Sequence, residues 1–154
     1  MTRAATIALA PLSALFGAAV KARSAGYRNG FLKTHRVSAP VISVGNITVG
    51  GTGKTPLVQW LARRLADGGR RVCIITRGYG RENPNQSIVV TDGEKILCDI
   101  ARSGDEAMML AWSLLGKAVI VCDADRVSAA KWASEGLKSD VLILDDGFQH
   151  RRVA

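Results

Sequence analysis

Val41-Ile-Ser-Val-Gly-Asn-Ile-Thr-Val-Gly-Gly-Thr-Gly-Lys-Thr55 is the stretch that decides the fold of this 154-residue chain. Its first four residues form an apolar run that predicts a buried strand, and apolar residues recur at helical spacing from Thr55 to Ala66. Between them, Gly50-Gly51-Thr52-Gly53-Lys54-Thr55 is close to the pattern G-x-x-x-x-G-K-[ST], although Thr48 stands where its first glycine is expected. In that pattern backbone N–H groups surround phosphate oxygens at the positive end of a helix. The stretch therefore predicts a strand, a phosphate-binding loop (P-loop) and a helix.

Strands and helices alternate along the rest of the chain. Apolar runs and helical periodicity predict strands at 72–76, 118–122 and 141–144 and helices at 103–115 and 126–135. Short apolar runs flank Asp92-Gly93, a turn signal, and predict a β-hairpin inserted beside the main sheet. For residues 39–154 this order predicts an α/β fold of the P-loop type, a mostly parallel sheet with helices on both faces.

Two acidic residues, Asp145 and Asp146, follow the last predicted strand. A P-loop needs a second anchor for its metal ion at the tip of a neighbouring strand, and these carboxylates can supply it. In such a site we expect Lys54 to neutralise the β- and γ-phosphates and the Thr55 hydroxyl to bind Mg²⁺. Two acids at a strand end are often only a solvated turn, but next to a P-loop they predict a site for ATP and Mg²⁺.

Ser103 and Glu106 have the spacing of a capping box, so the local sequence favours Ser103 as a helix cap. Phosphate transfer to an alcohol also needs a carboxylate that accepts the hydroxyl proton. This segment is expected at the carboxyl edge of the sheet, where ligands of α/β proteins bind. Asp105 is therefore a candidate base, and it can cap the helix as well.

Other polar residues gather in two loops. Arg77 and Arg81 belong to a glycine-bearing loop and are candidates for contacts with a substrate phosphate, although loop arginines are more often only solvated. Gln149 and His150 follow the paired aspartates, and a lone His at such a position is more often a surface residue.

The composition restricts the class of partner only loosely. The hydrophobic share is 47%, enough for the core of one domain, and the net charge of +8 favours phosphates, nucleic acid or an anionic membrane. The three cysteines are far apart, without a CxxC pair and beside apolar runs, which predicts free buried thiols and no metal site.

Residues 1–38 have the layout of an interfacial membrane anchor. The stretch from Ala4 to Val20 is mildly apolar but too short to span a bilayer, and Pro11 interrupts it. It lacks a convincing cleavage site for a secretory signal. Its apolar residues share a helical face, and basic residues follow it: Ile7, Leu12, Leu15, Phe16 and Val20, then Lys21, Arg23, Arg28, Lys33 and Arg36. The alternative is a helix packed on its own domain.

Four segments together resemble the tetraacyldisaccharide 4'-kinase family: 41–56, Thr76-Arg-Gly-Tyr-Gly-Arg81, Gly104-Asp-Glu106 and Leu144-Asp-Asp-Gly-Phe-Gln-His150. Each is weak alone, but four in this order are specific. The resemblance implies transfer of phosphate from ATP to the 4'-hydroxyl of a tetraacylated disaccharide 1-phosphate, which forms lipid IV-A. It also implies a peripheral or monotopic protein on the cytoplasmic face of the bacterial inner membrane, whose partners are the lipid substrate and the membrane surface, without an obligate protein partner.

The resemblance also implies roles for individual residues. The family's nucleotide loop, which normally lacks the first glycine, matches Thr48, Val49, Gly50, Gly51, Thr52, Gly53, Lys54 and Thr55. Asp105 matches the family's proposed base, and Glu106, Asp145 and Asp146 match acids around the metal. Gln149 and His150 match a supporting turn of the active site. Family members are about twice as long, so we expect a fragment that lacks a second lobe and with it a His paired with the catalytic Asp.

Three alternatives remain at this point. The first is a partitioning-type or cell-division-positioning ATPase. Proteins of that class carry a signature lysine just before the Gly-Gly, where this chain has Val49. A nucleic-acid-binding module would need an aromatic stacking platform, and only Tyr27 and Tyr79 lie near basic clusters, so no nucleic acid is expected. The third is a fragment that binds ATP or lipid without turnover.

Overall fold

The computed structural model describes residues 17–18, 20–45, 53–147 and 153. The chain divides into two compact units, residues 1–34 and residues 35–154. Several predicted site residues, 48–52 of the P-loop together with Gln149 and His150, lie outside the described residues.

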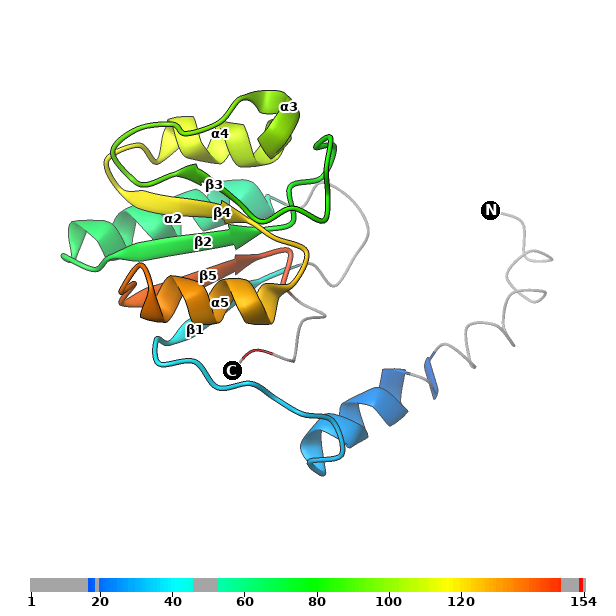
Figure 1. Ribbon diagram of the computed structural model, residues 1–154. Helices are drawn as coiled ribbons and strands as arrows, with labels where there is room; N and C mark the ends of the chain where they lie inside the picture. Colours follow the sequence, from blue (N-terminus) through cyan, green and yellow to red (C-terminus); the bar gives the residue numbers. More distant parts are fainter. Residues whose placement is uncertain (1–16, 19, 46–52, 148–152, 154) are drawn as a thin grey trace, which may run out of the picture. The chain divides into compact units, whose positions relative to one another are not determined.

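The larger unit is built on a five-stranded sheet with the order β1-β5-β2-β4-β3. Its strands are β1 (Val41–Val44), β2 (Val72–Thr76), β3 (Ile88–Thr91), β4 (Ala118–Cys122) and β5 (Val141–Asp145). All except β3 are parallel, with Val44 beside Asp145 and Thr76 beside Cys122. The carboxyl ends of the parallel strands therefore lie together at one edge of the sheet (Figure 1).

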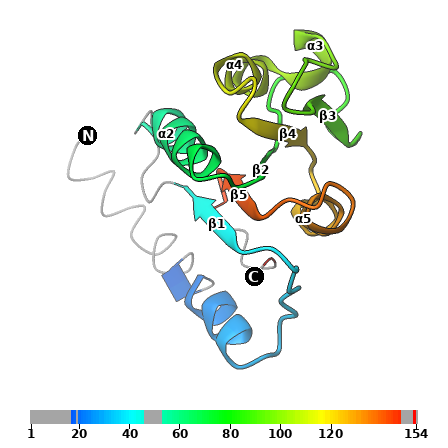
Figure 2. The same cartoon turned by 90° about the vertical axis from the view of Figure 1, so that its left-hand side faces the viewer.

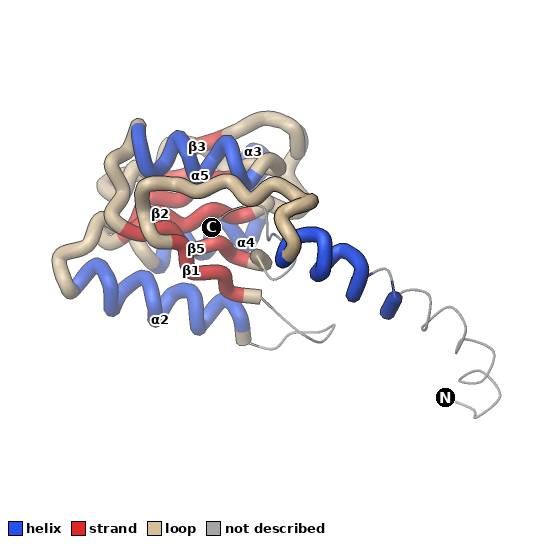
Figure 3. Tube along the Cα trace, turned by 90° about the horizontal axis from the view of Figure 1, so that it is seen from below, coloured by secondary structure: helices blue, strands red, loops and turns tan. Residues whose placement is uncertain are grey.

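Helices cover both faces of this sheet. They are α2 (Lys54–Asp67), α3 (Ile100–Ser103), α4 (Asp105–Ser113) and α5 (Arg126–Glu135). α2 and α4 lie on one face and α5 on the other (Figure 2), and Figure 3 shows the strands between α2 and α5 from below. The predicted fold class, a mostly parallel sheet with helices on both faces, is confirmed.

The core has two parts because neighbouring residues of a strand point to opposite faces. Ile74 packs with Val58 and Leu110 under α2 and α4, whereas Ile75 packs with Ala130 under α5. All five side chains are completely buried. Burying one such isoleucine contributes about 1.5–3 kcal/mol. The core thereby holds the strand ends, and with them the site, in fixed positions.

The predicted β-hairpin is present only in reduced form. The turn forms, because the Asp92 carboxylate accepts hydrogen bonds from the Glu94 and Lys95 amides and Gly93 has a φ of +96°. Its first arm, however, is β3, which pairs antiparallel with β4 as an edge strand of the main sheet. Its second arm is reduced to one bridge between Thr91 and Ile96.

The predicted helix 103–115 is wrong at its start, and so is its cap. Gly104, with a φ of +81°, separates α3 from α4 and is itself the N-cap of α4, without a side-chain hydrogen bond. Ser103 ends α3, and its buried hydroxyl donates to the Asp99 carbonyl at 2.9 Å. The capping box therefore does not form, and Asp105, the first residue of α4, does not cap it.

The smaller unit and the cysteines complete the comparison with the sequence. Residues 20–28 are helical, and Val20 is exposed in this unit; the other apolar residues predicted to share its face lie outside the described residues. No helix within the described ranges has the length and apolar character needed to cross a bilayer. All three cysteines are free thiols, as predicted; Cys73 and Cys122 are also buried as predicted, whereas Cys98 is only half-buried.

Candidate active site

A pocket of about 210 Å³ lies at the carboxyl edge of the sheet. Its lining comes from the start of α2, the end of β2 and the loop after it, α4 and the end of β5: Lys54, Thr55, Thr76, Tyr79, Glu106, Asp145 and Asp146. Five of these residues were predicted from the sequence for nucleotide or metal binding. The fold brings them together from segments up to 92 residues apart in the chain.

The start of α2 is suited to an anion. Gly53 is the N-cap with a φ of +75°, a conformation that disfavours residues with a side chain, and it leaves the first turn without a side-chain cap. No acidic residue lies in that first turn. The amides there and the positive end of the helix dipole can therefore act on a bound phosphate.

Lys54 is held by Asp146. The Lys54 ammonium donates to the Asp146 carboxylate at 2.6 Å, and this hydrogen bond is the main reason that the pKa of Lys54 is raised. Asp146 reaches the pocket because it adopts a left-handed conformation with a φ of 56°, directly after β5. The pair directs one positive charge into the pocket, and an ammonium has further protons to donate to a phosphate.

Asp145 is the buried acid of the site, with a relative exposure of 6%. Burial raises the pKa of its carboxyl group, and the charge of Glu106 raises it further, whereas Lys54 acts in the opposite direction. The negative charges of Asp145, Glu106 and Asp146 therefore repel one another, and a cation bound between them would relieve this repulsion.

The oxygen ligands around this pocket suit a Mg²⁺ ion that is bound partly by the protein and partly by phosphate and water. Carboxylate and hydroxyl oxygens are suitable ligands for Mg²⁺, which usually keeps several waters and is bound through one or two carboxylates and substrate phosphates. Among the described residues no three acids, histidines or cysteines are close enough to enclose a metal ion by themselves. The acids flank the pocket and leave room for phosphate and water.

Arg126, the first residue of α5, binds the backbone next to the site and was missed by the sequence analysis. Its buried guanidinium donates to the Asp123 carbonyl at 3.0 Å and to the Asp145 carbonyl at 3.2 Å. Burial lowers its pKa. The Asp125 side chain caps this helix, and a cation in a first helical turn opposes the helix dipole. This unfavourable position is the sequence feature that could have indicated a special role for Arg126.

Tyr79 and Thr76 were also missed. Both line the pocket, at and just after the end of β2. The Arg77 guanidinium donates to the Tyr79 hydroxyl at 3.4 Å and lies 5.6 Å from the centre of its ring. Arg77 is exposed, so it remains available to an anion near the pocket. The signal for Tyr79 was an aromatic residue between glycines at the carboxyl edge.

Arg81 does not have the predicted exposure to substrate. Its side chain is 5% exposed, and its guanidinium donates to the carbonyls of Pro84, Gln86 and Cys122. The structure therefore does not present Arg81 to a substrate phosphate, because the side chain is buried and its two terminal nitrogens donate to backbone carbonyls.

Asp105 lies beside the pocket but is not part of its lining. It is exposed at the start of α4, next to Glu106, which does line the pocket. Its position leaves its carboxylate accessible to a substrate that approaches from solvent.

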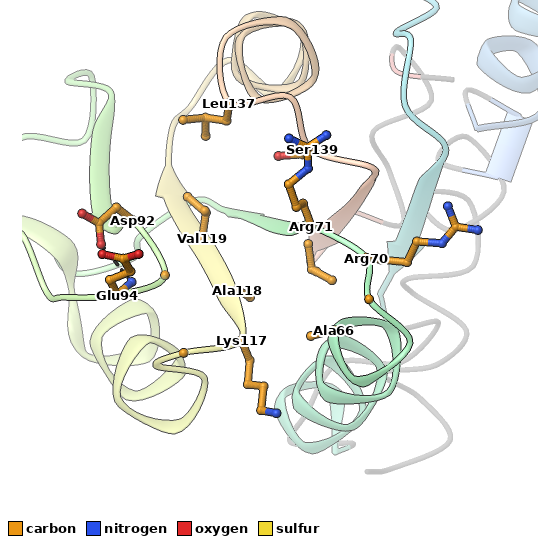
Figure 4. A pocket seen from close by; sticks show the side chains of 14 residues that line it. Ala66, Arg70, Arg71, Asp92, Glu94, Lys117, Ala118, Val119, Leu137 and Ser139 are labelled. Carbon is orange, nitrogen blue, oxygen red and sulfur yellow. Dashed lines mark hydrogen bonds between the residues drawn. The ribbon is translucent and has the colours of Figure 1, made fainter.

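A larger cavity of about 540 Å³ lies among the loops at the opposite edge of the sheet. Figure 4 shows Asp92 and Glu94 on one side of it, Arg70 and Arg71 on the other and Ala118 between them. None of the residues predicted for phosphate transfer lines it. Size alone therefore does not identify the active site.

Comparisons with known proteins point to one family. The sequence model of the tetraacyldisaccharide-1-P 4'-kinases (LpxK) matches residues 5–154. The tetraacyldisaccharide 4'-kinase of Geobacter sulfurreducens is 46% identical over 145 residues, which are 94% of this chain and 41% of that protein. That of Anaeromyxobacter dehalogenans (strain 2CP-C) is 47% identical over 151 residues, 96% of this chain and 39% of that protein.

A solved structure supports the same relationship. The crystal structure of LpxK from Aquifex aeolicus in complex with ATP matches with a TM-score of 0.84 and 40% identity, over 96% of this chain and 45% of that one. The chain thus spans about two fifths of the length of the relatives that it matches.

Proposed function

The chain belongs to the tetraacyldisaccharide-1-P 4'-kinase family, and from this premise we propose that it is the nucleotide-binding part of a lipid A kinase. The proposed reaction transfers the γ-phosphate of ATP to the 4'-hydroxyl of a tetraacyldisaccharide 1-phosphate. One observation carries the proposal: Lys54 and Thr55, at the start of α2, share a pocket with Glu106, Asp145 and Asp146.

The nucleotide phosphates would lie at the start of α2. In this proposal residues 48–55 would supply the loop that binds the phosphate oxygens, and the Lys54 ammonium would contact the β- and γ-phosphates. Lys54 is already directed into the pocket by Asp146. The structure of the Aquifex relative is a complex with ATP, which supports ATP as the co-substrate.

Thr55, Glu106, Asp145 and Asp146 are the residues that would hold Mg²⁺. An ion held there would neutralise negative charge on the nucleotide phosphates. The protein contributes the orientation of these oxygens: β5 and Arg126 hold Asp145, and the first turn of α4 holds Glu106.

Asp105 is the proposed general base. Its carboxylate accepts the proton of the 4'-hydroxyl as the hydroxyl oxygen attacks the γ-phosphorus, and ADP leaves. The exposed position of Asp105 beside the pocket suits an acceptor that arrives from outside. Gln149 and His150 are assigned to support of this site.

Arg77 is the proposed contact for an anionic group of the lipid substrate. It is exposed, and its contact with Tyr79 holds it next to the pocket. A guanidinium suits this task because its planar donors match phosphate oxygens.

Residues 1–38 are proposed to bind the membrane surface on the cytoplasmic side of the inner membrane. The apolar stretch and the basic residues after it, including Lys21, Arg23 and Arg28, suit an anionic lipid surface. Residues 39–154 form the nucleotide-binding domain in this proposal.

The test is transfer of labelled phosphate from ATP to a tetraacyldisaccharide 1-phosphate in detergent micelles. The chain is compared with a version continued by the sequence that follows it in the relatives, because the chain covers only about two fifths of them. Transfer by the longer version alone supports a nucleotide-binding part that needs a second lobe. If both hydrolyse ATP and neither modifies the lipid, the substrate is wrong and only nucleotide binding remains.

A further inference from the structure

The loop between β2 and β3, residues 77–87, is fastened by one buried arginine. This loop is drawn in green beside α3 in Figure 1. Arg81 donates to the carbonyls of Pro84 and Gln86 within the loop and, at 3.3 Å, to the carbonyl of Cys122 at the end of β4. One side chain therefore both closes the loop on itself and joins it to the sheet.

The same loop packs against the segment that begins α4, with no space for a side chain between them. A Cβ atom at Gly104 would overlap the carbonyl oxygen of Tyr79. A Cβ atom at Gly78 would lie 2.9 Å from the Ser103 carbonyl oxygen and 3.0 Å from the Cys122 sulfur. The Glu82 amide also donates to the Ala101 carbonyl at 2.9 Å. A movement of the loop would thus displace the start of α4.

Each side of this contact contributes a residue to the pocket. Tyr79 comes from the loop, and Glu106 from the first turn of α4, two residues after Gly104. Arg81 does not line the pocket itself.

We propose that Arg81 is a positioning residue of this site, which fixes Tyr79 and Glu106 relative to each other by holding loop 77–87 against the start of α4. The consequence for Mg²⁺ rests on the proposed function, because it takes Glu106 as one of the acids around the metal.

The chemistry of Arg81 suits this task. Among the described residues no carboxylate lies at ion-pair distance from it, and its two terminal nitrogens donate to backbone carbonyls. A guanidinium presents donors in a rigid fork and can bind several carbonyls at once, whereas a lysine ammonium is one point on a flexible stem. Arg81→Lys therefore keeps the charge and removes the set of hydrogen bonds that joins the loop to the sheet.

The experiment compares Arg81→Lys with Arg102→Lys, the same substitution at an exposed arginine of α3. ATP affinity is measured by calorimetry with Mg²⁺ and again with EDTA. We expect Arg81→Lys to weaken Mg²⁺-dependent binding about tenfold, the usual loss for a disturbed outer-shell contact, while binding in EDTA changes less than about twofold. Arg102→Lys should match the wild type in both conditions.

Hydrogen exchange provides a readout that does not depend on nucleotide. In Arg81→Lys we expect faster exchange in residues 77–87 and also at the start of α4, with α5 unchanged. Gly104→Ala, which disturbs the same contact from the other side, should give the same pattern if Arg81→Lys folds poorly. The effects of the two variants should not add, because both open one contact.

Several results would overturn the proposal. One is loss of ATP affinity in Arg81→Lys to the same extent with and without Mg²⁺, which indicates a general defect of folding. Another is faster exchange confined to the loop, with α4 unaffected. If the wild type binds no ATP at all, the proposed function fails, and the exchange experiment still decides whether Arg81 joins the loop to α4.

Discussion

Replacement of Lys54 by methionine should separate binding from folding. The side chain keeps most of its length and loses its ammonium, which lies 2.6 Å from Asp146. The two side chains are 29% and 43% exposed, and pairs of this kind contribute about 0–1 kcal/mol to stability. The free energy of unfolding should therefore fall by no more than about 1 kcal/mol.

The loss of nucleotide affinity should be larger. A hydrogen bond to a charged group contributes about 1.5–3 kcal/mol, and about 1.4 kcal/mol corresponds to a factor of ten. The variant also leaves the negative charges of Glu106, Asp145 and Asp146 in the pocket without the positive charge of Lys54. We expect Mg²⁺-ATP affinity to fall about 10- to 150-fold.

The matched control is Lys117→Met. Lys117 forms an ion pair of 2.7 Å with Asp67, on exposed side chains away from the pocket. Calorimetric ATP affinity and urea unfolding are measured for both variants. The reasoning is refuted if both variants lose the same affinity, or if Lys54→Met loses several kcal/mol of stability and binds ATP normally.

Three further changes test other parts of the structure. Burial and the charge of Glu106 raise the pKa of Asp145 above 3.8, the ordinary pKa of an Asp carboxyl group. The wild type therefore loses stability as the pH rises from 3.8 through the raised pKa, and the loss persists at higher pH. Asp145→Asn avoids this loss, so its stability relative to the wild type should increase with pH in urea unfolding, while Mg²⁺-dependent ATP binding is lost; a difference that does not vary with pH contradicts the shift. Asp105→Ala should abolish phosphate transfer in the longer version and leave ATP affinity unchanged by calorimetry, and normal transfer would remove Asp105 from the mechanism. Ile74→Ala should lower the free energy of unfolding by about 2–5 kcal/mol, since it empties a completely buried position, and a loss below about 1 kcal/mol would contradict the packing described for β2.

The fold and four of the seven residues that line the pocket follow from local sequence. Apolar runs such as 72–76 become strands because they are buried on both faces, and the order of elements then determines which ends meet. Lys54, Thr55, Asp145 and Asp146 each stand at a strand or helix end, so the pattern alone brings them to one edge.

The parts that local sequence did not predict depend on contacts between distant segments. Ser103 has the spacing of a cap, but tight packing of Gly104 on Tyr79 breaks the helix there and makes Ser103 the end of α3. Arg81 reads as a solvated loop residue until the carbonyl of Cys122, 41 residues away, is brought next to it. Arg126 is a similar case, because one of its acceptors is the carbonyl of Asp145.

The left-handed backbone at Asp146 places a limit on how this position can evolve. With a φ of 56° it tolerates mainly Gly, Asn and Asp, and of these only Asp is negatively charged. A saturation library at position 146 should thus fall into three classes: folded and functional for Asp, folded and inactive for Asn and Gly, and destabilised for β-branched or bulky residues. A conservative exchange to Glu, which keeps the charge, would belong with the destabilised class because its backbone and not its chemistry is unsuitable.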